Sequence, residues 1–249
     1  MKLENVIAKR AHKTIYRDGN TAVKVFDENF KKADILNEAL NLARVEETSL
    51  NIPKLCGVTA IDGKWALITE FAEGETMAEL IKKNPGRTEE YLEKFVDLQL
   101  KMHNEKVPML SKLKEKMHGK ISASGLDPSI RYELHARLEG MPKHSKLCHG
   151  DFNPGNIIVG NDGKMYILDW SHATQGNAST DAARTYLLFA LSERPELADM
   201  YLDLFCKKSD TARQYVQKWL PIVAASQLVK GKPEERELLL RWANVVEYE

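Results

Sequence analysis

The feature that most constrains the fold of this chain is a change in hydrophobic periodicity near residue 72. Before it, short apolar or β-branched runs alternate with polar turns, a pattern typical of strands. After it, apolar residues recur mainly at three- and four-residue spacing, which is typical of helices. Strands followed by helices indicate an α+β protein. The sequence therefore predicts a strand-rich region followed by a mainly helical one.

The strand-rich region is expected to contain five strands and one helix. The expected strands lie at residues 6–8, 14–17, 22–26, 55–61 and 65–71. Between the third and the fourth, Ile35, Ala39 and Leu42 recur at helical spacing within residues 30–45. These apolar residues predict one helix that packs on the strands.

The helical region is interrupted once by a strand-like segment. Two apolar stripes support helices, one formed by Leu92, Phe95, Leu98 and Met102, and the other by Ile130, Leu134 and Leu138. Between residues 146 and 169 there follow a strand-like stretch, a polar loop and a hairpin of residues 157–159 and 165–168. We expect an N-terminal lobe at 1–71, a hinge at 72–75 and a C-terminal lobe at 76–249.

Composition excludes several classes of protein. Lysine and arginine number 36, as do aspartate and glutamate, so no broad basic surface for nucleic acid is indicated. The longest weakly polar run, residues 219–229, is too short to span a membrane. Three cysteines without a metal-binding spacing fit a reducing compartment. We therefore expect a cytoplasmic protein with no nucleic-acid or membrane partner; the sequence gives no indication of its oligomeric state.

The stretch from His149 to Asn156, followed by a hairpin that ends at Asp169, carries the strongest chemical signal. His149, Asp151 and Asn156 match the H-x-D-x-x-x-x-N loop of kinases, in which the aspartate receives the acceptor hydroxyl's proton and the asparagine binds metal. A later aspartate supplies the second metal ligand, and Asp169 fits that order. Read singly, these residues are ordinary turn residues. A zinc site at His149, Asp151 and His172 is the weaker alternative.

A kinase also needs a cation on the nucleotide phosphates. The stretch Thr21 to Lys24 resembles the V-A-I-K strand pattern, so Lys24 is the candidate. Glu38 shares the apolar face of the expected helix, where a carboxylate requires a buried cation. We therefore predict that Glu38 pairs with Lys24, with Glu46 and Glu47 as the fallback partners.

Together these motifs resemble the aminoglycoside phosphotransferase and choline kinase family. Residues 149–156 look like that family's H-G-D-x-x-P-x-N loop, and Ile167-Leu168-Asp169-Trp170 looks like its second metal-binding motif. Gly176 and Asp181 are similar to a later segment whose aspartate supports the catalytic loop.

The resemblance implies a bilobal protein-kinase-like fold and a Mg²⁺-dependent transfer of the γ-phosphoryl group of ATP, or of GTP, to a small-molecule hydroxyl. Asp151 would be the catalytic base, and Asn156 and Asp169 would bind Mg²⁺. Lys24, held by Glu38, would contact the phosphates, and residues 70 and 72 (Glu70 and Ala72) would bind the nucleotide base.

The sequence leaves two other functions open. The turn at residues 9–13 has no glycine and relies on Ala11 and basic residues to cover the phosphates, which favours a catalytically weak or inactive nucleotide-binding protein. A protein kinase is less favoured, because only the eleven residues 170–180 separate Asp169 from Asp181 and no A-P-E sequence occurs.

The acceptor is not readable from the sequence. An acidic site for aminoglycosides would draw on Glu247 and Glu249. A choline-like cation would favour an aromatic box, for which the candidates are Tyr215, Trp219, Trp242 and Tyr248. Sugars and amino alcohols remain equally open.

Overall fold

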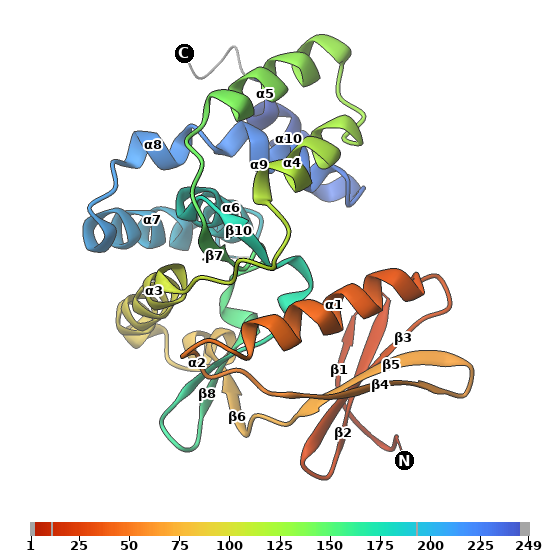
Figure 1. Cartoon of the computed structure of the whole chain (residues 1–249). Helices are drawn as coiled ribbons and strands as arrows, with labels where there is room; N and C mark the ends of the chain where they lie inside the picture. The colour runs from red at the N-terminus through yellow and green to blue at the C-terminus, as the bar shows by residue number, and fades with distance from the viewer. Residues whose placement is uncertain (1–2, 11, 193, 245–249) are drawn as a thin grey trace. The chain divides into compact units, whose positions relative to one another are not determined.

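An antiparallel five-stranded sheet forms the N-terminal part of the computed structural model (Figure 1). Its strands follow the order β1-β2-β3-β5-β4. Their bounds are β1 Asn5–Arg10, β2 Lys13–Asp18, β3 Thr21–Phe26, β4 Leu55–Ile61 and β5 Lys64–Glu70. Val23 and Phe26 of β3 are buried, as are Ala66 and Leu67 of β5. The five strands expected from the alternating pattern are therefore present.

Helix α1, Lys32–Val45, packs along one face of this sheet (Figure 1). Its inner face buries Ile35, Ala39 and Leu42, whereas Leu36 and Leu40 are exposed. The helix begins two residues later than residue 30, the start predicted from the periodicity. Its apolar stripe is the one that the sequence predicts, and Glu38 lies within it, 4% exposed.

The structure describes residues 3–10, 12–192 and 194–244. Contacts divide the chain into two compact units: a sheet unit, Met1–Lys83 with Pro154–His172, and a helical unit, Asn84–Asn153 with Ala173–Glu249. These bounds differ from the expected lobes 1–71 and 76–249. The difference arises because a segment from the middle of the chain pairs with the end of the N-terminal region.

That pairing forms a second sheet in the sheet unit, with strand order β6-β8-β9. Its strands are β6 Gly74–Thr76, β8 Ile157–Gly160 and β9 Met165–Ile167. Gly74 lies opposite Gly160 at a φ of 147°, and a Cβ at Gly74 would come within 2.2 Å of the Val159 carbonyl oxygen. Only glycine fits there. Part of the expected hinge, 72–75, is thus a strand, and helix α2, Met77–Lys83, follows it.

The helical unit surrounds an aromatic core. Its helices are α3 Thr88–Asn104, α4 Leu113–Ser122, α5 Pro128–Gly140, α6 Ala178–Ala190, α7 Glu196–Ser209, α8 Arg213–Gln217, α9 Leu220–Leu228 and α10 Arg236–Ala243. Phe95 of α3 contacts Phe152, Phe189 and Tyr201, with ring centroids 4.5 to 5.9 Å apart. The predicted stripe of α3 is buried, and so are Leu134 and Leu138 of α5.

A short ladder of β7, Lys146–Cys148, and β10, Thr174–Gly176, completes this unit. Within the residues described, no helix combines the length and the apolar character that crossing a membrane requires.

Candidate active site

The sheet unit contains an ion pair between Lys24 of β3 and Glu38 of α1. Both side chains are largely buried, at 13% and 5% exposure. Burial lowers the pKa of Lys24, but the carboxylates of Asp169 and Glu38 outweigh it and hold the pKa above its ordinary value. The pairing predicted from the apolar face of the helix is therefore present. The fallback partners are placed elsewhere: the Glu46 carboxylate accepts a hydrogen bond from the Leu55 amide at 2.5 Å, and Glu47 is exposed.

Asp169 joins this pair from the end of the β8–β9 hairpin. Its carboxylate lies 3.4 Å from Lys24 Nζ and accepts a hydrogen bond from Lys13 Nζ at 2.8 Å. Burial alone would raise the pKa of Asp169, yet Lys24 and Lys13 outweigh it and hold the pKa well below its usual range. We call Lys13, Lys24, Glu38 and Asp169 the ion-pair cluster. Lys13 comes from the glycine-free turn. The sequence predicts that basic residues of this turn cover the phosphates, but it does not predict the contact between Lys13 and Asp169.

Backbone pairing brings Asn156 beside Asp169. The hairpin pairs Ile157 with Ile167, and the Leu168 amide donates to the Asn156 carbonyl oxygen at 2.8 Å. Asp169 itself has a φ of 62°, a left-handed backbone that aspartate tolerates better than most residues. The sheet unit therefore brings together the backbone of Asn156 and Asp169, the two candidates for metal ligands, and the Asp169 carboxylate lies next to Lys24.

Asp151 belongs to the helical unit, in a loop that Asp181 of α6 holds in place. The Asp181 carboxylate accepts hydrogen bonds from the amides of Gly150, at 2.6 Å, and His149, at 3.1 Å, and contacts His103 Nε2 at 3.2 Å. Burial would raise the pKa of Asp181, but His103, His149 and the Gly150 amide lower it overall. The supporting aspartate expected from the resemblance therefore contacts the loop that carries Asp151.

Basic residues surround Asp151 on the helical unit. Its carboxylate lies 3.7 Å from Arg184 Nη2 of α6 and 4.0 Å from Lys230 Nζ, which follows α9. Arg184 is almost buried, with a side chain only 6% exposed. Sequence reasoning missed both contacts. The available signal was the position of Arg184 three residues after Asp181, which places the two side chains on one face of α6.

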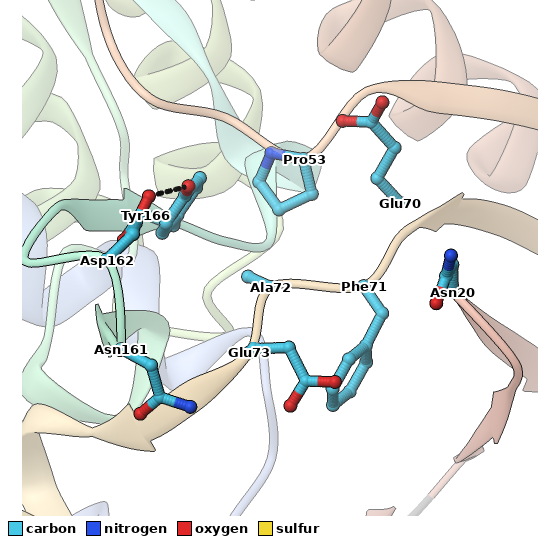
Figure 2. A pocket seen from close by; sticks show the side chains of 9 residues that line it. All are labelled: Asn20, Pro53, Glu70, Phe71, Ala72, Glu73, Asn161, Asp162 and Tyr166. Carbon is cyan, nitrogen blue, oxygen red and sulfur yellow. Dashed lines mark hydrogen bonds between the residues drawn. The ribbon is translucent and has the colours of Figure 1, made fainter.

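Glu70 and Ala72 line a cavity of about 490 Å³ in the sheet unit (Figure 2). It is bounded by Asn20, Pro53, Glu70, Phe71, Ala72, Glu73, Asn161, Asp162 and Tyr166. The Glu70 amide donates to the Lys54 carbonyl oxygen and the Phe71 amide to that of Asn20, both at 2.9 Å, and the residues described offer Ala72 no hydrogen bond. None of the ion-pair cluster lines this cavity, so the cavity is distinct from that cluster.

The remaining candidates from the sequence have structural roles or fall outside the description. Trp219 is fully buried, the Tyr215 hydroxyl accepts a hydrogen bond from Asn177 at 2.7 Å, and Trp242 stacks on Tyr186. Ala11, Glu247, Tyr248 and Glu249 lie outside the described residues. No cluster of three or more His, Cys, Asp or Glu side chains suited to a metal occurs in ranges 3–10, 12–192 and 194–244, which leaves the zinc alternative without a ligand set.

Comparison with known proteins identifies the family. A model of the phosphotransferase enzyme family, APH, matches residues 12–219, so this chain belongs to that family. A comparison with curated protein sequences gives no match. The resemblance to aminoglycoside phosphotransferases and choline kinases inferred from the motifs is thereby confirmed.

Solved structures show the same fold at low sequence identity. An aminoglycoside phosphotransferase, APH(4)-Ia, in a ternary complex with ADP and hygromycin B, is 12% identical with a TM-score of 0.70, over 96% of this chain and 89% of that one. The choline kinase LicA from Streptococcus pneumoniae is 16% identical with a TM-score of 0.63, over 100% and 93%. An aminoglycoside-3'-phosphotransferase of type VIII is 17% identical with a TM-score of 0.63, over 92% of each chain. The fold is α+β and protein-kinase-like, as the sequence predicts.

Proposed function

We propose that this protein is a Mg²⁺-dependent kinase that transfers the γ-phosphoryl group of ATP, or of GTP, to a hydroxyl of a small molecule. The observation that supports this most directly is the ion-pair cluster. Lys24 is fixed by Glu38 and lies 3.4 Å from Asp169, the arrangement that a kinase needs between its phosphate-binding lysine and a metal-binding aspartate. The nucleotide complex of APH(4)-Ia supports the nucleotide assignment.

The residues present fit a magnesium ion. Mg²⁺ favours oxygen ligands and is commonly held by one or two protein side chains together with substrate phosphates. Asn156 and Asp169, neighbours on the hairpin, offer such a pair. A bound Mg²⁺ would neutralise negative charge on the β- and γ-phosphates. In this proposal Lys13 and Lys24, which balance the Asp169 carboxylate, also contact phosphate oxygens, Lys24 at the α- and β-phosphates.

Asp151 aligns the acceptor hydroxyl and receives its proton. The acceptor oxygen forms a bond to the γ-phosphorus as the bond from that phosphorus to the bridging oxygen of the nucleoside diphosphate breaks. Because phosphoryl transfer has a loose transition state, the proton moves late and positioning provides most of the acceleration. The hydrogen bonds from His149 and Gly150 to Asp181 fix the loop that carries Asp151.

The nucleotide base is assigned to the segment that follows β5. In kinases of this fold, backbone groups of this connection bind the base edge, and the Ala72 amide is the candidate donor because the described residues give it no hydrogen bond. Glu70 is the second candidate, with its carbonyl oxygen as the acceptor. The segment 72–75 remains our proposed hinge, with the lobes at 1–71 and 76–249.

The segment after Asp169 argues against a protein substrate. Residues 174–176 form β10, which pairs with β7, and the Gln175 side chain donates to the carbonyl oxygens of Pro108 and Leu110. An extended peptide platform normally occupies this part of a protein kinase. Here the segment is already tied into the helical unit, which favours a compact acceptor.

The decisive experiment measures ADP or GDP release with a panel of small alcohols, sugars, aminoglycosides and amino alcohols, beside a peptide library. We expect transfer to at least one small hydroxyl compound that requires Mg²⁺, and no comparable transfer to peptides. Nucleotide binding without turnover of any acceptor would instead favour an inactive nucleotide-binding protein. Robust phosphorylation of peptides alone would identify a protein kinase.

A further inference from the structure

The helical unit concentrates positive charge around Asp151. Arg184 and Lys230 lie within 4.0 Å of its carboxylate. Lys116 and Lys120 lie four residues apart on α4, and therefore on one face of that helix. Helix α4 packs against α9, the helix that leads to Lys230, and α9 packs against α6, which carries Arg184. We call Lys116, Lys120, Arg184 and Lys230 the basic cluster.

The charges of this cluster act on one another. Burial lowers the pKa of Lys120 to about 7, and the charges of Lys116, Arg184 and Lys230 contribute, while Asp151 partly offsets them. Burial also lowers the pKa of Lys116 to about 8, with a further contribution from Arg184. Like charges held together in a partly buried place destabilise the folded chain. An arrangement of this kind is expected where a ligand supplies the missing negative charge.

Carboxylates near the basic cluster offset part of its charge. Glu235 acts on Arg184 and on Lys230, and Asp181 acts on Arg184. Glu235 accepts a hydrogen bond from Lys232 at 2.7 Å and also contacts Gln227. Asp181 is engaged with the catalytic loop. Asp151 ion-pairs with two members of the cluster, Arg184 and Lys230. At Lys120, the positive charges of Lys116, Arg184 and Lys230 are opposed by the negative charge of Asp151, so positive charge predominates there.

Two members of the cluster have donors available for a ligand. Among the described residues Lys120 Nζ has neither a hydrogen bond nor an ion pair. Arg184 lies 3.7 Å from Asp151, longer than an ordinary hydrogen bond, although its guanidinium offers five N–H donors.

We propose that the acceptor of this kinase is an anion, a small hydroxyl compound that also carries a carboxylate or a phosphate group, and that Lys120, Arg184 and Lys230 bind this group beside Asp151. The inference rests on the proposed function, since it places the acceptor at Asp151. It separates this protein from kinases of cationic acceptors, which the basic cluster would repel. Lys116 strengthens the positive potential at Lys120, but we do not assign it a contact with the acceptor.

The test uses four probes that share a three-carbon skeleton and differ in charge: glycerol, glycerate, glycerol phosphate and aminopropanediol. Thermal shifts are measured without nucleotide at constant ionic strength, and ADP release is measured with ATP and Mg²⁺. The variants are Lys120→Gln, Lys120→Arg, which keeps the charge, and Lys207→Gln. Lys207 is exposed on α7 and lies outside the cluster, so its variant removes the same charge from the same unit.

We expect the two anions to raise the Tm of the wild type and of Lys207→Gln more than glycerol or aminopropanediol does. In Lys120→Gln this preference is lost, with apparent affinity for the anions reduced about tenfold or more, and in Lys120→Arg much of it returns. The larger shift, from glycerate or from glycerol phosphate, tells which anionic group the site prefers.

An equal or larger shift from the neutral or cationic probe would overturn the anionic acceptor. The proposal would also be overturned if Lys120→Gln bound the anions with the same affinity as Lys207→Gln. Failure of the proposed function looks different: the anions would bind in the expected manner, but no acceptor of any charge would be phosphorylated. Transfer to choline or an aminoglycoside that is unchanged in Lys120→Gln would support the kinase and contradict the anionic acceptor.

Discussion

The two charged clusters of this protein differ in their balance. In the sheet unit, Lys13 and Lys24 are matched by Glu38 and Asp169, and three ion pairs connect the four residues. In the helical unit, by contrast, Lys116, Arg184 and Lys230 all act on Lys120, and Asp151 opposes them. A balanced cluster is suited to a ligand that brings its own counter-ion, as a magnesium nucleotide does. An unbalanced one is suited to a ligand that brings net charge.

The largest effect that this comparison predicts concerns Asp151, the proposed base. Asp151→Asn keeps the shape of the side chain but removes its ability to accept a proton. Turnover of a verified acceptor is expected to fall about 10²- to 10⁴-fold, the usual scale for losing a general base, while the sheet unit keeps its nucleotide affinity. Steady-state kinetics with nucleotide binding measured in parallel checks this. Retention of more than about a third of wild-type turnover would remove Asp151 from the role.

The next effect breaks the balanced cluster. Asp169→Ala removes a proposed metal ligand and leaves Lys13 and Lys24 without their shared carboxylate. The wild type is expected to gain roughly 5 to 10 °C in Tm from saturating ATP with Mg²⁺, and the variant to lose the part of this gain that depends on Mg²⁺. Asn156→Ala should lose less, because a neutral amide binds the ion more weakly. An unchanged Mg²⁺-dependent shift in Asp169→Ala would place the metal on other residues.

A smaller effect concerns the carboxylate that holds Lys24. Glu38→Gln preserves the packing of α1 but replaces an ion pair by a neutral contact, so Lys24 is positioned less firmly. Nucleotide affinity is expected to fall about tenfold. The matched control is Glu47→Gln, which removes an exposed charge just beyond the same helix. If both variants bind nucleotide equally well, the Lys24–Glu38 pair does not organise the phosphate site.

The balanced cluster was largely predictable from the sequence, and for a local reason. Glu38 lies on an apolar helix face between Ile35 and Leu42, and a buried carboxylate there requires a cation. Lys24 lies on an adjacent strand with a recognisable pattern. Asn156 and Asp169 flank a hairpin, and strand pairing brings the two ends of a hairpin together. Periodicity and turns therefore carry most of this geometry.

The basic cluster was not predictable in the same way. Its members come from α4, α6 and the end of α9, and no periodicity within one helix shows which helices pack together. Lys116 and Lys120 share a helix face, but a surface helix often carries such a lysine pair. The pairing of Gly74 with Gly160 was missed for the same reason, since β6 is only three residues long and its partner lies far along the chain. Long-range packing determines these features.

The smallest expected effect sharpens the comparison through pH. Because the pKa of Lys120 in the folded protein is about 7 and that of Lys116 is about 8, both below the ordinary value for lysine, these side chains lose their protons near neutral pH. Binding of an anion needs the protonated form. The affinity for an anionic acceptor is therefore present below pH 7 and declines as the pH rises through 7 to 8, by a few-fold over this interval.

The measurement is the KM for a carboxylate acceptor such as glycerate between pH 6 and 9, a range in which the charge of the acceptor stays constant. The groups that act on Lys120 are Lys116, Arg184 and Lys230, which favour its neutral form, and Asp151, which favours the charged one. Lys120→Arg keeps its charge throughout this range, so its KM should rise less steeply and follow only the remaining lysines, Lys116 and Lys230, whose pKa values burial also lowers. A KM that rises equally in the wild type and in Lys120→Arg would show that Lys120 does not bind the acceptor. The titration of Lys120 is what the substitution removes, and in that case its removal would not affect binding.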